Sequence, residues 1–100
     1  MHLIEILLPL ADDSGRPFPD DMFGHVRDAL TAKFGGLTAF SRAPAKGLSR
    51  DGGKTIQDDI LVFEVMAEEL DGAWWARYRK DLEHDFAQDE VMISSTVTRI

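Results

Sequence analysis

The chain has 100 residues, of which 11 are basic and 18 acidic, and its formal net charge is −7. This length is typical of a single domain, and a hydrophobic content of 44% is typical of a folded globular protein. The absence of cysteine excludes disulfides, thiolate metal sites and cysteine nucleophiles. We therefore expect one domain over residues 1–100. We expect no membrane partner, because no apolar run approaches the roughly 20 residues that cross a bilayer, and no nucleic-acid partner, because the net charge is negative.

The first eight residues do not form a secretory signal. Glu5 interrupts their apolar run, and no lysine or arginine precedes it. A signal peptide has a basic head and a longer apolar core. The sequence therefore predicts a cytoplasmic protein.

The first half of the chain begins with a strand, followed by a helix. Residues 2–9 alternate between two faces, as the side chains of a strand do. After turn-forming residues 11–19, an apolar stripe of helical spacing predicts a helix over residues 20–34. Pro19 favours the start of this helix, and Gly35 favours its left-handed end.

The second half has two strands, a helix and a final strand. Residues 37–43 and 58–66 are predicted as a hairpin with a long loop, which contains Pro44, Gly47 and an Asp51-Gly52-Gly53 turn. A helix is expected over residues 72–87, with Asp71 as its N-cap, and a strand over residues 91–99.

The order β-α-β-β-α-β predicts an α+β, ferredoxin-like two-layer sandwich. Right-handed crossovers in both halves give a four-stranded antiparallel sheet in the order 4-1-3-2, with both helices on one face. In the two central strands, we expect the helix side to take Ile4, Ile6, Leu8, Leu61, Phe63 and Val65.

The opposite, helix-free face of the sheet is more apolar than a solvent-facing sheet should be. Such a face marks an interface or a ligand cavity, so we expect a homodimer that covers it. The central strands contribute Leu3, Glu5, Leu7, Ile60, Val62 and Glu64 to this face. The fourth strand is expected to add Met92, Ser94 and Thr96. The sequence allows two orientations of the second strand, and in one of them Thr38, Phe40 and Arg42 join this face.

In length and element order the chain resembles the dimeric α+β barrel proteins, whose paired sheets enclose a pocket. This resemblance covers the whole chain and is one of architecture, without a residue motif. Residues 34–45, Phe-Gly-Gly-Leu-Thr-Ala-Phe-Ser-Arg-Ala-Pro-Ala, also resemble a stretch of small uncharacterised bacterial proteins. The first resemblance implies a homodimer with a pocket, and the second implies no activity.

Glu5 and Glu64 are the candidate catalytic residues, because they are the acidic residues of the helix-free face in neighbouring strands. Two close carboxylates in a partly dry cavity can supply a general base. Alternatively, each pairs with a basic residue across a dimer interface or stays hydrated. If hairpin partners have residue numbers that sum to about 102, Glu64 faces Thr38 and Arg42 faces Ile60.

The candidate ligand-binding residues are Arg42, Phe40, Met92 and Ser94, which we expect to share this face. The guanidinium group of Arg42 suits a carboxylate or a phosphate. A surface arginine or an interface ion pair is the alternative.

No metal or cofactor site is predicted. The histidines His2, His25 and His84 are scattered, and the latter two are expected on polar helix surfaces. Trp74, Trp75 and Tyr78 have the spacing of a core-facing helix stripe, and nucleotide-binding glycine motifs are absent from the sequence.

Two functions remain open at this point, and so does whether the protein is an enzyme. The first is a small-molecule pocket, for an apolar acid, between dimerised sheets. The second is a non-catalytic interaction or regulatory module that docks an acidic partner on the basic loop 42–54. Four basic residues there stand against Asp51 alone, a net charge of +3, although the loop could simply balance the acidic body.

Overall fold

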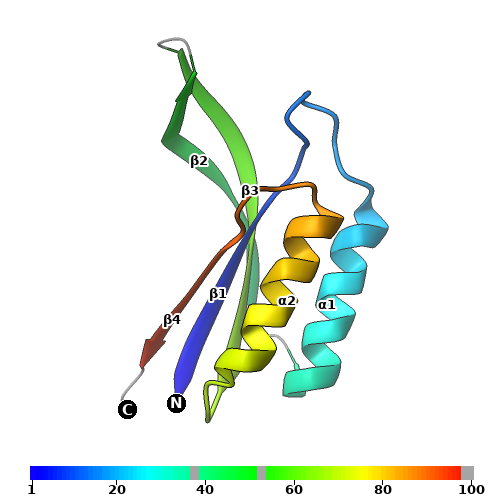
Figure 1. Cartoon of the computed structure of the whole chain (residues 1–100), viewed down its shortest axis with the longest axis vertical. Helices are drawn as coiled ribbons and strands as arrows, with labels where there is room; N and C mark the ends of the chain where they lie inside the picture. The colour runs from blue at the N-terminus through cyan, green and yellow to red at the C-terminus, as the bar shows by residue number, and fades with distance from the viewer. Residues whose placement is uncertain (37–38, 52–53, 98–100) are drawn as a thin grey trace.

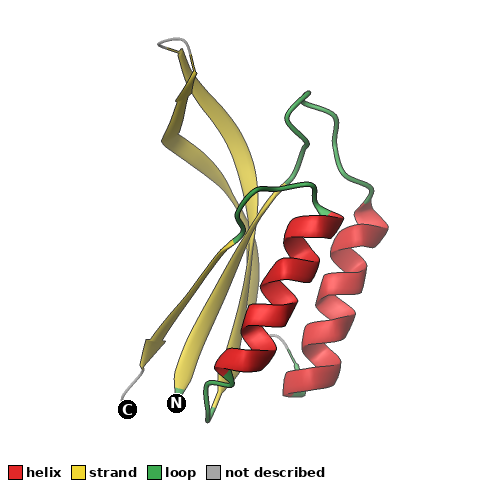
Figure 2. Cartoon of the chain, in the orientation of Figure 1, coloured by secondary structure: helices red, strands yellow, loops and turns green. Residues whose placement is uncertain are grey.

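Two helices pack against one side of an antiparallel sheet (Figure 1, Figure 2). The computed structural model describes the backbone of residues 1–36, 39–51 and 54–97, and the side chains of residues 1–36 and 60–97. The expected α+β class is confirmed. In chain order the elements are β1 (His2–Pro9), α1 (Asp20–Phe34), β2 (Ala39–Asp51), β3 (Lys54–Ala67), α2 (Gly72–Asp85) and β4 (Met92–Val97).

The strands lie in the order β2-β3-β1-β4, and every neighbouring pair is antiparallel. The two central strands, β1 and β3, therefore come from opposite halves of the chain. Each half contributes one crossover helix, and both helices cover the same face (Figure 2). No helix or strand of the described residues covers the opposite, helix-free face.

The core lies between β1, β3 and the two helices, as the alternation of β1 predicts. Ile4, Ile6 and Leu8 are at most 1% exposed. Their partners in β3 include Val65 and Phe63, which are also buried. Burial of such apolar side chains is the main favourable contribution to folding.

The helix α1 has the bounds that the sequence predicts. Pro19 precedes its first residue, and Gly35 ends it in the left-handed region at φ 82°. The Gly35 N–H donates to the Thr31 carbonyl at 2.8 Å, which satisfies one of the last carbonyls of the helix. Val26 and Leu30 are its buried residues.

The helix α2 begins where its predicted N-cap places it. The Asp71 carboxylate accepts a hydrogen bond from the Trp74 N–H at 3.1 Å. The helix ends at Asp85, two residues earlier than predicted, and Phe86 then turns into the core at 1% exposure. Ala87 follows with φ 50°, so the chain leaves the helical path there.

The long loop predicted between the second and third strands is mostly strand. β2 continues to Asp51 and β3 starts at Lys54, with an irregularity in register between Ala45 and Ser49. Pro44 is compatible with a continuous strand because β2 lies at the edge of the sheet. No further strand on its outer side needs the N–H group that proline lacks. Pairing of β3 with β1 ends at Ile60, so residues 44–51 and 54–59 form a two-stranded hairpin arm beyond β1 (Figure 1).

The hairpin register differs by one residue from the expected one. Ala39 lies opposite Glu64 and Arg42 opposite Leu61, so that partner numbers sum to 103. A shift of one residue exchanges the two faces of a strand. The backbone positions of Phe40 and Arg42 therefore lie opposite Phe63 and Leu61. The placement of their side chains on the helix-free face stays a prediction. Their side chains, and Thr38 as a whole, lie outside the described residues.

Neither of the two helices that the described residues form is long and apolar enough to cross a membrane.

Candidate functional site

The helix-free face carries two glutamates at its centre, in directly opposed positions. Glu5 of β1 pairs with Glu64 of β3 on one side and with Ser94 of β4 on the other. Cβ atoms of directly opposed residues lie about 4.5–5.5 Å apart. The register thus brings together the two carboxylates that the sequence singled out.

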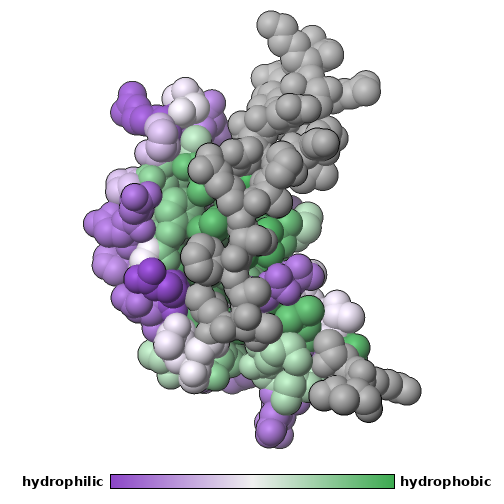
Figure 3. Space-filling model, turned by 180° about the vertical axis from the view of Figure 1, so that it is seen from behind, coloured by the Kyte–Doolittle hydropathy of each residue, from purple (hydrophilic) through white to green (hydrophobic). Residues whose placement is uncertain are grey.

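Apolar residues flank this pair along both central strands. Leu3 and Met66 form the next same-face pair on one side, and Leu7 and Val62 on the other. These four side chains are half-buried, and Met92, opposite Leu7, is 61% exposed. Figure 3 shows hydrophobic and hydrophilic residues interspersed on the side of the molecule away from the helices, whereas the helices present a mostly hydrophilic surface.

The electrostatics of the pair are unfavourable in the isolated chain. Like charges directly opposite each other destabilise a sheet. In the part of the chain that the structure describes, neither Glu5 nor Glu64 has an ion pair or a side-chain hydrogen bond. Carboxylates accept hydrogen bonds and do not donate them. A molecule that offers donors to both would therefore satisfy this site.

The other predicted ligand-binding residues separate into two groups. Met92 and Ser94 lie on the same face as the glutamates, in β4. Phe40 and Arg42 belong to β2, where their backbone positions lie opposite Phe63 and Leu61. The structure therefore brings Met92 and Ser94 to the face of the two glutamates, whereas Phe40 and Arg42 are described by their backbone alone.

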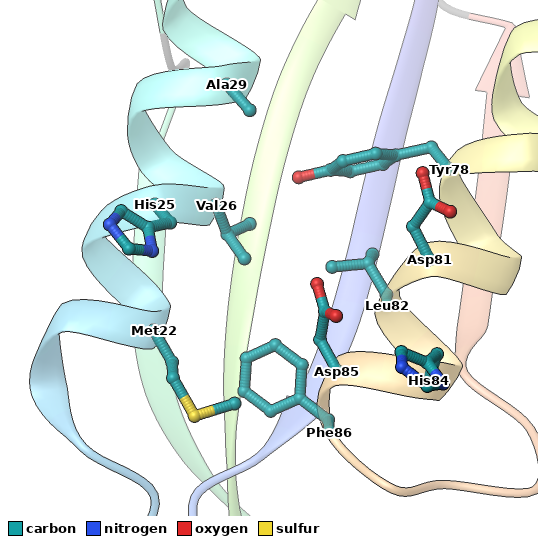
Figure 4. Close-up of a pocket in the computed structure, with 10 residues that line it drawn as sticks. All are labelled: Met22, His25, Val26, Ala29, Tyr78, Asp81, Leu82, His84, Asp85 and Phe86. Atoms are coloured by element: carbon teal, nitrogen blue, oxygen red, sulfur yellow. The ribbon is translucent and has the colours of Figure 1, made fainter.

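A second concave site lies between α1 and α2, on the side of the helices away from the sheet. This interhelical groove has a volume of about 610 Å³ (Figure 4). Its lining includes His25 and His84, which the sequence analysis predicts on the polar surfaces of two separate helices. The complete lining is Met22, His25, Val26, Ala29, Tyr78, Asp81, Leu82, His84, Asp85 and Phe86.

Sequence reasoning missed this groove because it identified each helix face but not how the faces meet. The pattern of apolar and polar positions at Tyr78, Asp81, Leu82 and Asp85 marks one edge of an amphipathic helix. The facing edge of α1 supplies His25 and Ala29. The distance between the helices depends on side chains elsewhere in the layer.

One end of the helix layer is filled by an aromatic cluster. Phe34 packs edge-on against Trp74 at a ring separation of 5.5 Å and stacks on Trp75 at 5.4 Å. Tyr78 stacks on Trp74 at 4.8 Å. The predicted core role of these residues is confirmed, with Trp75 at 7% exposure and Trp74 and Tyr78 half-buried. Tyr78 belongs both to this cluster and to the lining of the groove.

The environment of the groove changes the acidity of its tyrosine. Burial, followed by the negative charges of Asp85 and Asp81, raises the pKa of Tyr78 from its ordinary value of 10.0 to about 12. The hydroxyl group is therefore protonated, and able to donate a hydrogen bond, well into the alkaline range. Figure 4 shows the hydroxyl group directed across the groove toward α1.

We expect the native protein to keep the Tyr78 proton until about pH 12, whereas the denatured chain releases it near pH 10.0. Since folding favours the protonated form, its contribution to stability is complete below pH 10.0 and is lost as the pH rises toward 12. Tyr78 is the one tyrosine of the sequence, so tyrosinate absorbance reports on it alone. Equal titration midpoints in native and denatured protein would contradict this expectation.

Comparison with known proteins identifies the fold but not a family. No family model and no curated protein matches the chain. A solved structure of a phage SAM lyase in complex with S-methyl-5'-thioadenosine superimposes with a TM-score of 0.67 at 14% identity. The match covers 95% of this chain and 79% of the lyase. At this identity the match shows a shared fold alone.

Proposed function

We propose that the protein is a ferredoxin-like homodimer, related in architecture to the dimeric α+β barrels, with a small-molecule pocket between two helix-free sheet faces. The observation that carries this proposal is the register that sets Glu5 opposite Glu64 within an apolar surface. The apolar part of that surface favours burial, and the carboxylates favour a polar occupant.

Pairing of two copies explains both properties of the face. In a two-fold dimer, the same patch of each copy contacts the other. The pairs Leu3–Met66 and Leu7–Val62 would form the apolar contacts on either side of the glutamates. Direct contact at the centre would bring four carboxylates together, which is costly. The two sheets therefore stay apart there and leave a pocket.

The chemistry of the pocket selects a mainly apolar molecule with hydroxyl or amino donors. Glu5 and Glu64 accept hydrogen bonds, and the apolar pairs around them contact the rest of the molecule. The apolar acid expected from the sequence fits less well. Such an acid would add a negative charge beside the two glutamates. The backbone of Arg42, the arginine expected to bind it, lies opposite Leu61 and not opposite a residue of the helix-free face.

The structural neighbour gives this proposal limited support. The phage SAM lyase is described in complex with S-methyl-5'-thioadenosine, a molecule with an apolar thioether and hydroxyl and amino donors. The architecture thus accommodates a ligand of the proposed class in another protein. Either carboxylate of this chain could also serve as a general base toward a bound molecule.

Calorimetric titration with S-methyl-5'-thioadenosine tests the proposal, with 3-phenylpropionate as an apolar acid for comparison. We expect the thioadenosine to bind more tightly. Hydrogen bonds to charged groups contribute about 1.5–3 kcal/mol, so Glu5→Gln and Glu64→Gln should each weaken binding by roughly 10- to 100-fold.

Glu69→Gln is the matched control, because Glu69 is exposed in the turn between β3 and α2. It should leave the affinity unchanged. Dimerisation should persist in Glu5→Gln and Glu64→Gln, since each removes a charge from the crowded centre. Unchanged ligand affinity in both variants, or a failure of both probes to bind, would contradict the pocket.

A second candidate function rests on the charge of residues 42–54, where four basic residues stand against Asp51 alone. The backbone of Lys46, Arg50 and Lys54 belongs to the hairpin arm beyond β1, which also contains Asp58 and Asp59. As an interaction module, the protein would bind an acidic chain such as polyglutamate with strong dependence on salt. Reversal of charge in Arg50→Glu and Lys54→Glu should abolish that binding, and retention of binding would exclude this alternative.

A further inference from the structure

The interhelical groove has the size and lining of a ligand site distinct from the sheet face. Small-molecule pockets have volumes of about 300–1,000 Å³, mostly apolar walls and a few polar groups. The groove, at about 610 Å³, falls within that range. Val26, Leu82 and Phe86 are buried beneath it, and Tyr78 closes it toward the aromatic cluster.

We propose that this groove binds a small organic cation, in which an ammonium group is joined to an apolar or aromatic body. The charge of the lining supports this choice. Asp81 and Asp85 both line the groove, and no lysine or arginine is among its described lining residues. Figure 4 shows the Asp85 carboxylate directed toward α1, on the same side as the Tyr78 hydroxyl group.

The two aspartates are available to a ligand. Neither makes a salt bridge or a side-chain hydrogen bond within the described part of the chain. Their negative charge reaches the interior of the groove, because both contribute to the raised pKa of Tyr78. An ammonium group between Asp85 and the Tyr78 ring would gain both charge attraction and a hydrogen-bond acceptor.

The aromatic cluster provides an independent indication that cations are attracted here. Lys33 Nζ lies 5.3 Å from the centroid of the Trp74 ring, within the range of a cation–π interaction. Trp74 in turn stacks on Tyr78, which lines the groove. One cation of the chain already lies on the stack at its Trp74 end. A ligand cation would use the Tyr78 end in the same way.

Three probes of matched shape separate the contribution of charge from that of apolar contact. These are 2-phenylethylammonium, neutral 2-phenylethanol and anionic 3-phenylpropionate, each titrated into isotope-labelled protein and followed by amide NMR shifts. We expect the ammonium to bind most tightly, with the largest shifts at groove residues such as Val26, Tyr78 and Leu82. Shifts confined to β1 and β3 would instead place the probe on the sheet face and overturn the proposal.

Charge-neutralising variants test the role of the two aspartates. Exposed ion pairs contribute modestly, so Asp81→Asn with Asp85→Asn should weaken ammonium binding by roughly 3- to 10-fold. Glu68→Gln with Glu69→Gln is the control, because it removes the same charge from the exposed turn before α2. Equal weakening by the two double variants would show a general charge effect and overturn the proposal.

A variant that fills the groove tests its location without changing charge. Ala29 is an exposed lining residue, so Ala29→Phe should block the groove while the helix remains folded. We expect loss of 2-phenylethylammonium binding in this variant and unchanged behaviour of the sheet face. Undiminished ammonium binding in Ala29→Phe would overturn the proposal, whatever the sheet face binds.

Discussion

Replacement of Phe63 by alanine will lower the free energy of unfolding by about 3–5 kcal/mol, the usual cost of removing a large aromatic side chain from a core. Phe63 is 2% exposed in the central strand β3, opposite Ile6 of β1. Its ring lies on the helix-covered face, so the variant leaves a cavity between the sheet and the helices. Denaturation by urea, followed by circular dichroism, measures the change.

Ser95→Ala is the control for this variant. Ser95 is exposed in the edge strand β4 and lies opposite Ile4, off the helix-free face, so its replacement should change stability by no more than about 0.5 kcal/mol. A loss below about 1 kcal/mol for Phe63→Ala would show that this part of the sheet is not packed as described.

Replacement of Leu7 by aspartate will prevent dimer formation. Leu7 lies on the helix-free face between Val62 and Met92, and one pair away from Glu5. A new carboxylate there would be buried in the proposed interface and repelled by the existing ones. A charge left buried and unpaired in an interface costs about 2–5 kcal/mol, so we expect the dimer dissociation constant to rise by roughly 30-fold or more. Dilution calorimetry measures it.

The fold of the single chain should tolerate this change, because Leu7 is only half-buried there. The circular dichroism spectrum of Leu7→Asp should match that of the parent protein. Leu70→Asp is the control, since Leu70 is 44% exposed in the turn before α2 and lies outside the helix-free face. A dimer of unchanged affinity in Leu7→Asp would exclude this face as the interface.

Local signals in the sequence were sufficient to place most elements. Pro19 and Gly35 mark the ends of α1, and Asp71 marks the start of α2, because caps depend on residues adjacent in the chain. The alternation in β1 identified its buried face. The predicted strand 37–43 was too short because Pro44 and Gly47 usually end a strand, whereas an edge position tolerates them.

The register could not be predicted, since it depends on how strands pair across the sheet. Glu5 and Glu64 were expected on the same face, but their direct opposition appears only in the pairing of β1 with β3. The register of the hairpin differs by one residue from the expected one, so Arg42 lies opposite Leu61 and not opposite Ile60. The same limit explains the missed groove, because Tyr78 and His25 belong to different helices whose relative placement is a tertiary property.

The mass of the unmodified protein in solution is the most direct test of the proposal that a second copy covers the helix-free face. Sedimentation equilibrium over a wide range of concentrations provides it without any label or variant. Our account predicts a particle of twice the 11.2 kDa chain mass, which shifts toward the chain mass on dilution. A particle of 11.2 kDa at the highest attainable concentration would contradict it.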